Sequence, residues 1–227
     1  MNYSYGMDYL ILGVTLLLTL GAQWYINHWY KKTQKISSKS HMSGADVARK
    51  ILDSNGLKEV KVVENSGVLS DHYDPRDKVV RLSSDIYHNK SIASVSVASH
   101  ECGHAIQDKD NYLFLRIRSS IVPLVNIAST LGYVAIMLGL FLGFFGFLKL
   151  GIAMECVILV FQLITLPVEF NASHRALKQV EELKIVDSKE HKFCRKMLTA
   201  AALTYVASVA TAVLQILRLV LLARRSD

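Results

Sequence analysis

Long apolar segments are the feature that most constrains the fold of this chain. They occupy residues 7–29, 121–167 and 197–223, and the middle one contains a single basic residue, Lys149. Because a helix needs roughly 20 residues to cross about 30 Å of hydrocarbon, the middle segment is long enough to cross twice. Hydrophobic residues make up 51% of the chain, too many for an ordinary soluble domain. We therefore expect an integral membrane protein, mostly α-helical, with about four membrane helices.

The first apolar segment is predicted to be an uncleaved anchor. No basic residue precedes it, its apolar stretch is long, and Gly21-Ala22-Gln23 is a weak site for a signal peptidase. A cleaved signal peptide normally has a basic start and a shorter apolar region. Residues 7–29 should therefore stay in the membrane.

Basic residues indicate which side of the membrane each polar region occupies. Four lysines follow the first apolar segment, and the stretch after Pro167 is again basic, whereas the tip near residues 146–151 has only Lys149. Lysine and arginine are retained on the cytoplasmic side during insertion, so we expect an outside N-terminus and cytoplasmic polar regions. Arg224 and Arg225 disagree with a fourth complete crossing. Either the last helix lies partly in the interface, or the charge rule fails there.

The net charge of +7 follows from this distribution of basic residues. Basic and aromatic residues do not interleave as a single-strand nucleic-acid surface requires, so we expect the lipid bilayer as a partner and no nucleic acid. The three cysteines are odd in number and form no CxxC pair, which argues against a disulfide framework. Nothing in the sequence defines an oligomeric state.

The polar region between the first two apolar segments is predicted to be a small α+β domain. Ser43 is a suitable N-cap for a helix over residues 44–55, and a second helix should begin near Ser91. Two β-branched runs, 60–64 and 78–83, indicate strands, with a turn at Asp74-Pro75-Arg76-Asp77 between them and the second run as an edge strand. Residues 31–43, rich in Lys, Ser and Gln, are the candidate tether.

The second predicted helix contains the sequence His100-Glu101-Cys102-Gly103-His104. Residues four apart lie on one helix face, so His100 and His104 can bind one Zn²⁺ with two imidazole nitrogens. Glu101 is rotated about 100° from His100, which suits a base that takes a proton from a water at the metal. Cys102 should point away from the metal and pack as a small hydrophobe. A glycine in mid-helix, Gly103, suggests that another group approaches the backbone closely.

A structural role for these histidines is the competing interpretation. In a chain with eight histidines, this pattern is expected by chance only about 0.01 times. Chance is therefore a poor explanation, and two histidines that are merely hydrogen-bonded on a surface helix remain the alternative. The sequence favours the metal site.

A catalytic zinc needs a third protein ligand, which the chain must supply further along. Between residues 111 and 180 the acidic candidates are Glu155 and Glu169. Glu155 lies inside an apolar segment, where an ionised group is costly and usually functional. Glu169 is preferred because it follows the end of the hairpin and opens a stretch with a helical pattern. Ser173, four residues later, would share its face and could support the site.

Two further residues could stabilise an oxyanion, which requires a hydrogen-bond donor near the developing charge. Arg175 lies close to Glu169 in the sequence, and Tyr205 lies early in the last apolar segment. Each also has a plain explanation, since Arg175 can sit at the membrane surface and Tyr205 can be an interfacial aromatic.

The segments HECGHAIQ (100–107) and PVEFNASHRAL (167–177) resemble the bacterial membrane-bound neutral zinc metallopeptidases of the YugP type. The similarity extends to residues 42–52, 69–83 and 200–207. Its order of parts is also similar to the HtpX-like and CAAX prenyl proteases, in which an aspartate stands where this chain has Ser173. His174 stands where arginine is expected in YugP-type relatives. The resemblance implies a zinc-dependent peptidase.

We therefore expect an anchor at 7–29, a zincin-like cytoplasmic region at 40–118, a membrane hairpin at 119–167, a ligand helix at 168–196 and a C-terminal membrane or interfacial helix at 197–223. The predicted function is a gluzincin-like endopeptidase acting on membrane or membrane-adjacent proteins. Zn²⁺ would be held by His100, His104 and Glu169, with Glu101 as the catalytic base. The strand at 78–83 could hold an extended substrate at its edge. The alternative is a non-catalytic zinc-binding scaffold or receptor, in which His174 could close the coordination shell.

Overall fold

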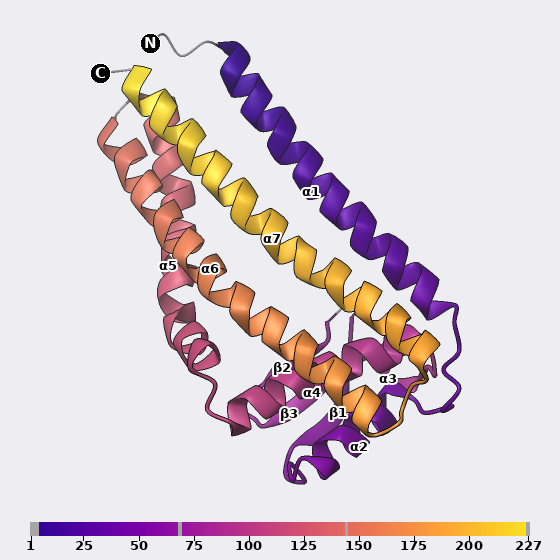
Figure 1. The fold of residues 1–227 in the computed structure, drawn as a ribbon. Helices are drawn as coiled ribbons and strands as arrows, with labels where there is room; N and C mark the ends of the chain where they lie inside the picture. The colour runs from indigo at the N-terminus through magenta and orange to yellow at the C-terminus, as the bar shows by residue number, and fades with distance from the viewer. Residues whose placement is uncertain (1–4, 68–69, 144, 226–227) are drawn as a thin grey trace. The chain divides into compact units, whose positions relative to one another are not determined.

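The computed structural model describes residues 5–67, 70–143 and 145–225. It is mostly helical, with seven helices and three short strands in these ranges (Figure 1). The chain forms two compact units. We call residues 1–23, 117–166 and 203–227 the membrane unit, and residues 24–116 and 167–202 the polar unit.

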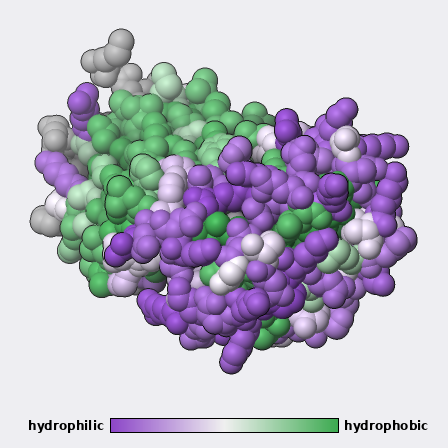
Figure 2. All heavy atoms as spheres, turned by 60° about the horizontal axis from the view of Figure 1, so that its bottom comes forward, coloured by the Kyte–Doolittle hydropathy of each residue, from purple (hydrophilic) through white to green (hydrophobic). Residues whose placement is uncertain are grey.

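Four helices in the described part of the chain are long and apolar enough to cross a membrane. They are α1 (Tyr5–Gln34), α5 (Leu113–Leu142), α6 (Phe145–Glu182) and α7 (Ser188–Arg225). Large apolar side chains such as Leu17 and Phe141 are more than 70% exposed within the membrane unit, as expected of surfaces that face lipid. In Figure 2 the surface of this unit is mostly hydrophobic, whereas that of the polar unit is mostly hydrophilic. The expected mostly helical fold, with about four apolar helices long enough to cross a membrane, is confirmed.

Small residues and one ion pair organise the membrane unit. Gly132, Gly139 and Gly151 leave no room for a methyl group at the α5–α6 contact, so the two helices of the hairpin approach closely. The Arg218 side chain in α7 donates to Asp8 in α1 at 2.6 Å, which neutralises both charges within apolar helices. The glycines thus allow α5 to pack closely on α6, and the ion pair links α7 to α1.

The polar unit has a small sheet covered by helices. Its helices are α2 (Gly44–Ser54), α3 (Ser84–His88) and α4 (Ile92–Lys109), together with the adjoining ends of the longer helices. The strands are β1 (Lys61–Asn65), β2 (His72–Asp74) and β3 (Val79–Ser83). The sequence predictions of an N-cap at Ser43 and a helix starting after Ser91 are confirmed, as is the turn between Asp74 and Val79.

The strand order is β1-β3-β2, with β1 parallel and β2 antiparallel to β3. The prediction that residues 78–83 form an edge strand is therefore wrong, because β3 is the central strand. The reason is β2, a strand of three residues too short to show an alternating pattern in the sequence. It occupies the side of β3 that would otherwise have been open.

Residues 31–43 are not a free tether. Lys31 to Gln34 continue α1, and the buried Ser38 donates its backbone N–H to the Lys90 carbonyl at 2.8 Å. The backbone N–H of Ile92 in turn donates to the Ile36 carbonyl at 2.9 Å. This segment is therefore bonded to the start of α4, the helix that carries the histidine pair.

The packing of α4 against α6 is close enough to require glycine. A methyl group on Gly103 would lie 2.5 Å from the carbonyl oxygen of Ala172, a backbone atom that cannot turn aside. The predicted close approach at Gly103 is thus confirmed. Cys102 is fully buried, and its thiol contacts the Ala48 carbonyl of α2. This agrees with the prediction that Cys102 packs as a small hydrophobe away from the metal. The three cysteines are free thiols.

Replacing Gly103 with Ala should destabilise the polar unit although alanine favours helices by about 1 kcal/mol. The added methyl would force α4 away from Ala172, and overpacking of this kind costs roughly 1–3 kcal/mol. We expect a lower thermal unfolding temperature in detergent and weaker zinc binding. Gly13→Ala is the matched control, because nothing lies within 4 Å of the methyl that it adds. An equal response of the two variants would contradict the proposed close packing.

Candidate metal centre

Three potential metal ligands converge where α4 packs on α6. The Nε2 atom of His100 lies 3.2 Å from Oε2 of Glu169, and Nε2 of His104 lies 3.7 Å from the same oxygen. The ligand atoms of all three residues lie within 4.8 Å of one another. Three ligands placed about 2.0–2.1 Å from a tetrahedral zinc ion are about 3.3–3.4 Å apart. The donor set and its spacing therefore fit Zn²⁺.

The side chains of this group are largely shielded from solvent, with exposed fractions of 14% for His100, 10% for His104 and 4% for Glu169. A carboxylate buried this deeply needs a partner with positive charge. A metal ion bound between this carboxylate and the two imidazoles would supply that positive charge. A buried group of this composition is typical of a metal site.

Gln107 fixes the orientation of His104. Its side-chain nitrogen donates to the Val168 carbonyl at 2.8 Å and to Oδ1 of Asn171 at 3.0 Å, which leaves its oxygen facing Nδ1 of His104 at 3.0 Å. Because that oxygen can only accept, Nδ1 of His104 must carry the proton. The lone pair of Nε2 is then directed to the candidate metal position, as in other histidine ligands whose second nitrogen is hydrogen-bonded.

Asn171 and Arg175 hold Gln107 in this orientation. The Arg175 side chain donates its Nε–H to Oδ1 of Asn171 at 2.8 Å, and its Nη1 is bonded to Asp110. The same Asn171 oxygen accepts from Gln107, so the amide cannot be flipped without losing both bonds. Arg175 thus supports the site through Asn171. These contacts engage two of its five N–H donors and hold the side chain between Asn171 and Asp110, so they do not favour the oxyanion role considered from the sequence.

His100 has an equivalent support. The hydroxyl of Ser173 lies 3.2 Å from Nδ1 of His100, and Ser173 is buried. The contact agrees with the predicted supporting role of Ser173 on the face of Glu169. A hydroxyl can accept a hydrogen bond from the Nδ1–H of an imidazole, although it carries no charge. Both histidines therefore have Nδ1 engaged and Nε2 turned toward Glu169.

Glu101 lies beside this group but is not part of it. It is 8% exposed, and burial raises the pKa of its carboxyl to about 7, with Glu169 adding to the effect and His100 opposing it. The backbone of Tyr73, in the edge strand β2, lies close enough to this carboxylate to lower its pKa slightly. Glu101 is therefore held at the junction between α4 and the edge of the sheet.

Three other residues considered from the sequence lie outside the group formed by His100, His104 and Glu169. Glu155 belongs to the membrane unit and is absent from the His100, His104 and Glu169 group, which is the metal-binding cluster among the described residues. His174 is exposed and is also outside the group. Tyr205 belongs to the membrane unit, so its role stays a prediction.

Gln107 and Asn171 were not identified from the sequence. A signal for Gln107 was present, since it lies three residues after His104 and therefore on the same helix face. Asn171 had no such signal. Its position is defined only by the packing of α6 on α4.

Comparison with known proteins agrees with this geometry. Residues 8–224 match the family described as "Putative neutral zinc metallopeptidase". The chain belongs to this family. It is also 42% identical over 217 residues to the "Putative membrane protease YugP" of Bacillus subtilis (strain 168), covering 95% of this chain and 96% of that protein. No solved structure matches the chain.

Zinc affinity should distinguish the ligands from their supports. Glu169→Ala removes a ligand and should nearly abolish binding of one zinc per chain, whereas Gln107→Leu frees the His104 ring and should weaken binding roughly 10- to 100-fold. Glu155→Ala is the matched control and should leave zinc content unchanged. Metal analysis and chelator competition on the purified variants measure the series. Full occupancy in the Glu169 variant, or depletion in the Glu155 variant, would show that the ligand was chosen wrongly.

Proposed function

We propose that this protein is a membrane-bound, zinc-dependent endopeptidase that hydrolyses peptide bonds of membrane or membrane-adjacent proteins. The observation that carries the proposal is the convergence of His100, His104 and Glu169 beside a separate carboxylate, Glu101. That combination is typical of gluzincin-like peptidases, in which three residues hold the metal and another moves the proton. Membership of the metallopeptidase family supports the same reaction.

In this proposal His100, His104 and Glu169 bind the metal through two imidazole nitrogens and one carboxylate. Zinc, when bound, polarises the substrate carbonyl and acidifies water at the site. Glu101 accepts a proton from the attacking water and returns it to the leaving amine. The water oxygen becomes bonded to the carbonyl carbon, and the C–N bond breaks. The products are one new carboxyl and one new amino terminus.

The edge of the sheet is suited to hold the substrate backbone. β2 pairs with β3 on one side only, and Tyr73 of β2 is in contact with Glu101. An extended peptide that pairs with an edge strand gains main-chain hydrogen bonds independent of its side chains. Its scissile carbonyl would then lie near both the base and the metal. In this proposal β2, rather than the strand at residues 78–83, holds the extended substrate.

The competing function is a scaffold or receptor that uses zinc structurally. A structural zinc site has four protein ligands, whereas a catalytic site has three and an open position. The group found among the described residues has three members, and His174 is not one of them. This count supports an enzyme.

Glu101→Gln should separate catalysis from metal binding. The amide keeps the shape of the side chain but cannot take the proton, so zinc content should stay near one per chain while turnover falls roughly 10²-fold or more. Turnover is measured with a proteome-derived peptide mixture and mass spectrometry of the products. Cleavage at the wild-type rate by the variant would contradict the peptidase mechanism.

We further propose that the polar unit is cytoplasmic, because basic residues flank the apolar helices on that side. A membrane-impermeant thiol reagent applied to intact cells should label a cysteine introduced at Lys149 and should not reach one introduced at Lys58. Both are made in a background lacking the natural cysteines. The reverse labelling pattern would place the metal site on the outer face of the membrane.

A further inference from the structure

A cavity of about 500 Å³ lies between α6 and α7 in the polar unit. We call it the α6–α7 groove. One wall is the face of α6 from Phe170 to Glu181, and the other is the face of α7 from His191 to Ala202. None of the three proposed metal ligands lines this groove, and the proposed mechanism gives the groove no role.

The groove begins at the candidate metal centre. Ser173 lines it, and the Ser173 hydroxyl contacts Nδ1 of the proposed ligand His100. Phe170, which follows the proposed ligand Glu169 in the chain, lines the same end. A molecule in the groove would therefore lie next to the group that holds the metal.

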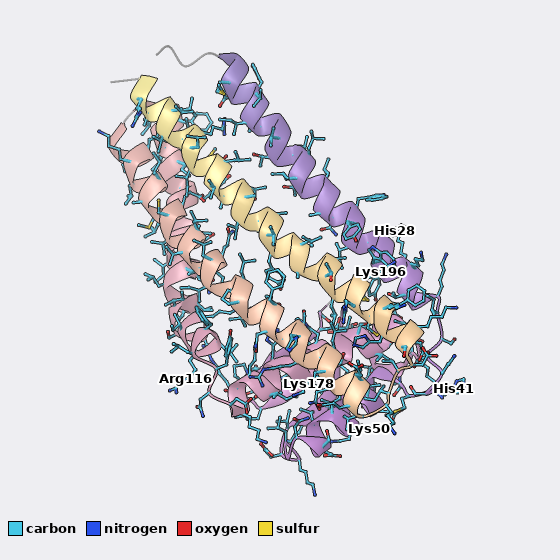
Figure 3. The ribbon with its side chains drawn as sticks, viewed as in Figure 1. His28, His41, Lys50, Arg116, Lys178 and Lys196 are labelled. Carbon is cyan, nitrogen blue, oxygen red and sulfur yellow. The ribbon has the colours of Figure 1, made fainter. Side chains whose placement is uncertain are left out.

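The charge of the groove is mainly positive. Lys178 extends from α6 (Figure 3) and Arg195 comes from α7, so the two cations line it from both walls. Arg195 has no carboxylate partner among the residues that the structure describes, whereas Lys178 forms an exposed salt bridge with Glu182, at 3.7 Å. Glu181 is the acidic residue in the lining, and it lies 3.8 Å from His191. The middle of the groove thus offers two cations to an anionic ligand.

The position of Lys178 along α6 argues against a phospholipid headgroup that contacts both cations, although Arg195 lies only two residues before the apolar run of α7. Lys178 lies about 11 residues beyond Pro167, where the apolar run of α6 ends, which is about 16 Å of helix. Each headgroup layer of a bilayer is only about 5–7 Å thick. A phosphate at the membrane surface would therefore not reach Lys178, whereas a polypeptide that leaves the membrane could extend along the groove.

We propose that the α6–α7 groove binds an acidic segment of the polypeptide substrate, with Lys178 and Arg195 contacting its carboxylates. The proposed ligand Glu169 and Lys178 are separated by about 13.5 Å along α6, and an extended peptide advances about 3.3 Å per residue. The preferred acidic residue is therefore about four positions from the scissile bond. This specificity rests on the proposed peptidase function, but binding in the groove can be measured without catalysis.

Binding is tested with full-length, zinc-loaded Glu101→Gln protein in detergent. The probes are two short fluorescent peptides of one apolar sequence that differ only in a central pair of residues, Asp-Asp or Asn-Asn. We expect the Asp peptide to bind roughly 3- to 10-fold more tightly at low salt, as expected for partly exposed ion pairs, and the preference to shrink as salt is added. Equal affinity for the two peptides would overturn the proposal.

Charge reversal assigns the preference to the groove. Lys178→Glu combined with Arg195→Glu should remove or invert the preference for Asp, and the milder Lys178→Gln with Arg195→Gln should remove it. Lys192→Glu is the matched control, because it reverses an exposed charge on α7 that does not line the groove. Zinc content and unfolding temperature show that each variant is folded. A preference that survives both double variants would overturn the proposal.

Cleavage distinguishes failure of the groove from failure of the proposed function. Wild-type protein should cleave a tryptic peptide mixture with Asp or Glu enriched about four residues from the cut. Cleavage without that enrichment would overturn the groove proposal and leave the peptidase intact. Peptide binding with an Asp preference but no cleavage dependent on Glu101 would support the groove and overturn the peptidase.

Reconstitution tests the lipid alternative. Wild-type protein and the double Glu variant are placed in phosphatidylcholine bilayers with and without phosphatidylglycerol, and their unfolding temperatures are compared. An equal response of the two proteins supports a peptide ligand. A stabilisation by phosphatidylglycerol that the charge reversal removes, with no preference for Asp peptides, would assign the groove to a headgroup and overturn the proposal.

Discussion

The close packing of α4 on α6 is the constraint on which the candidate site depends. His100 and His104 are on α4, Glu169 is on α6, and their ligand atoms meet only because Gly103 lets the Ala172 carbonyl approach the α4 backbone. Glu169, the proposed third ligand, lies 65 residues after His104 in the sequence. The helix that carries it begins in an apolar segment and ends in the polar unit.

Hydrogen bonds to the Nδ1 atoms of the two histidines fix the direction in which their Nε2 atoms point. Gln107 and Ser173 engage the Nδ1 atoms of the two histidines, and Asn171 with Arg175 holds Gln107 in place. Three of these four residues come from α6, the helix that also supplies Glu169. Ligand and support are thus positioned by one element, so a shift of α6 would disturb metal binding and imidazole orientation together.

Local patterns made much of this structure predictable. The apolar segments, the capping of α2 by Ser43 and the spacing of His100 and His104 each depend on residues close together in the chain. β2 and the position of β3 in the sheet were not predictable, because strand order depends on pairing between distant segments. Asn171 likewise has no recognisable pattern, and its function follows only from the packing of two helices. Glu169 could be chosen over Glu155 by its position at the end of the apolar run.

The central claim is that two imidazoles and one carboxylate hold a zinc ion with one position open. X-ray absorption at the zinc edge of the purified, zinc-loaded protein tests it most directly. The claim predicts a first shell of nitrogen and oxygen atoms at about 2.0–2.1 Å, with multiple scattering from two imidazoles. A sulfur ligand at about 2.3 Å, or scattering from three or more imidazoles, would contradict it.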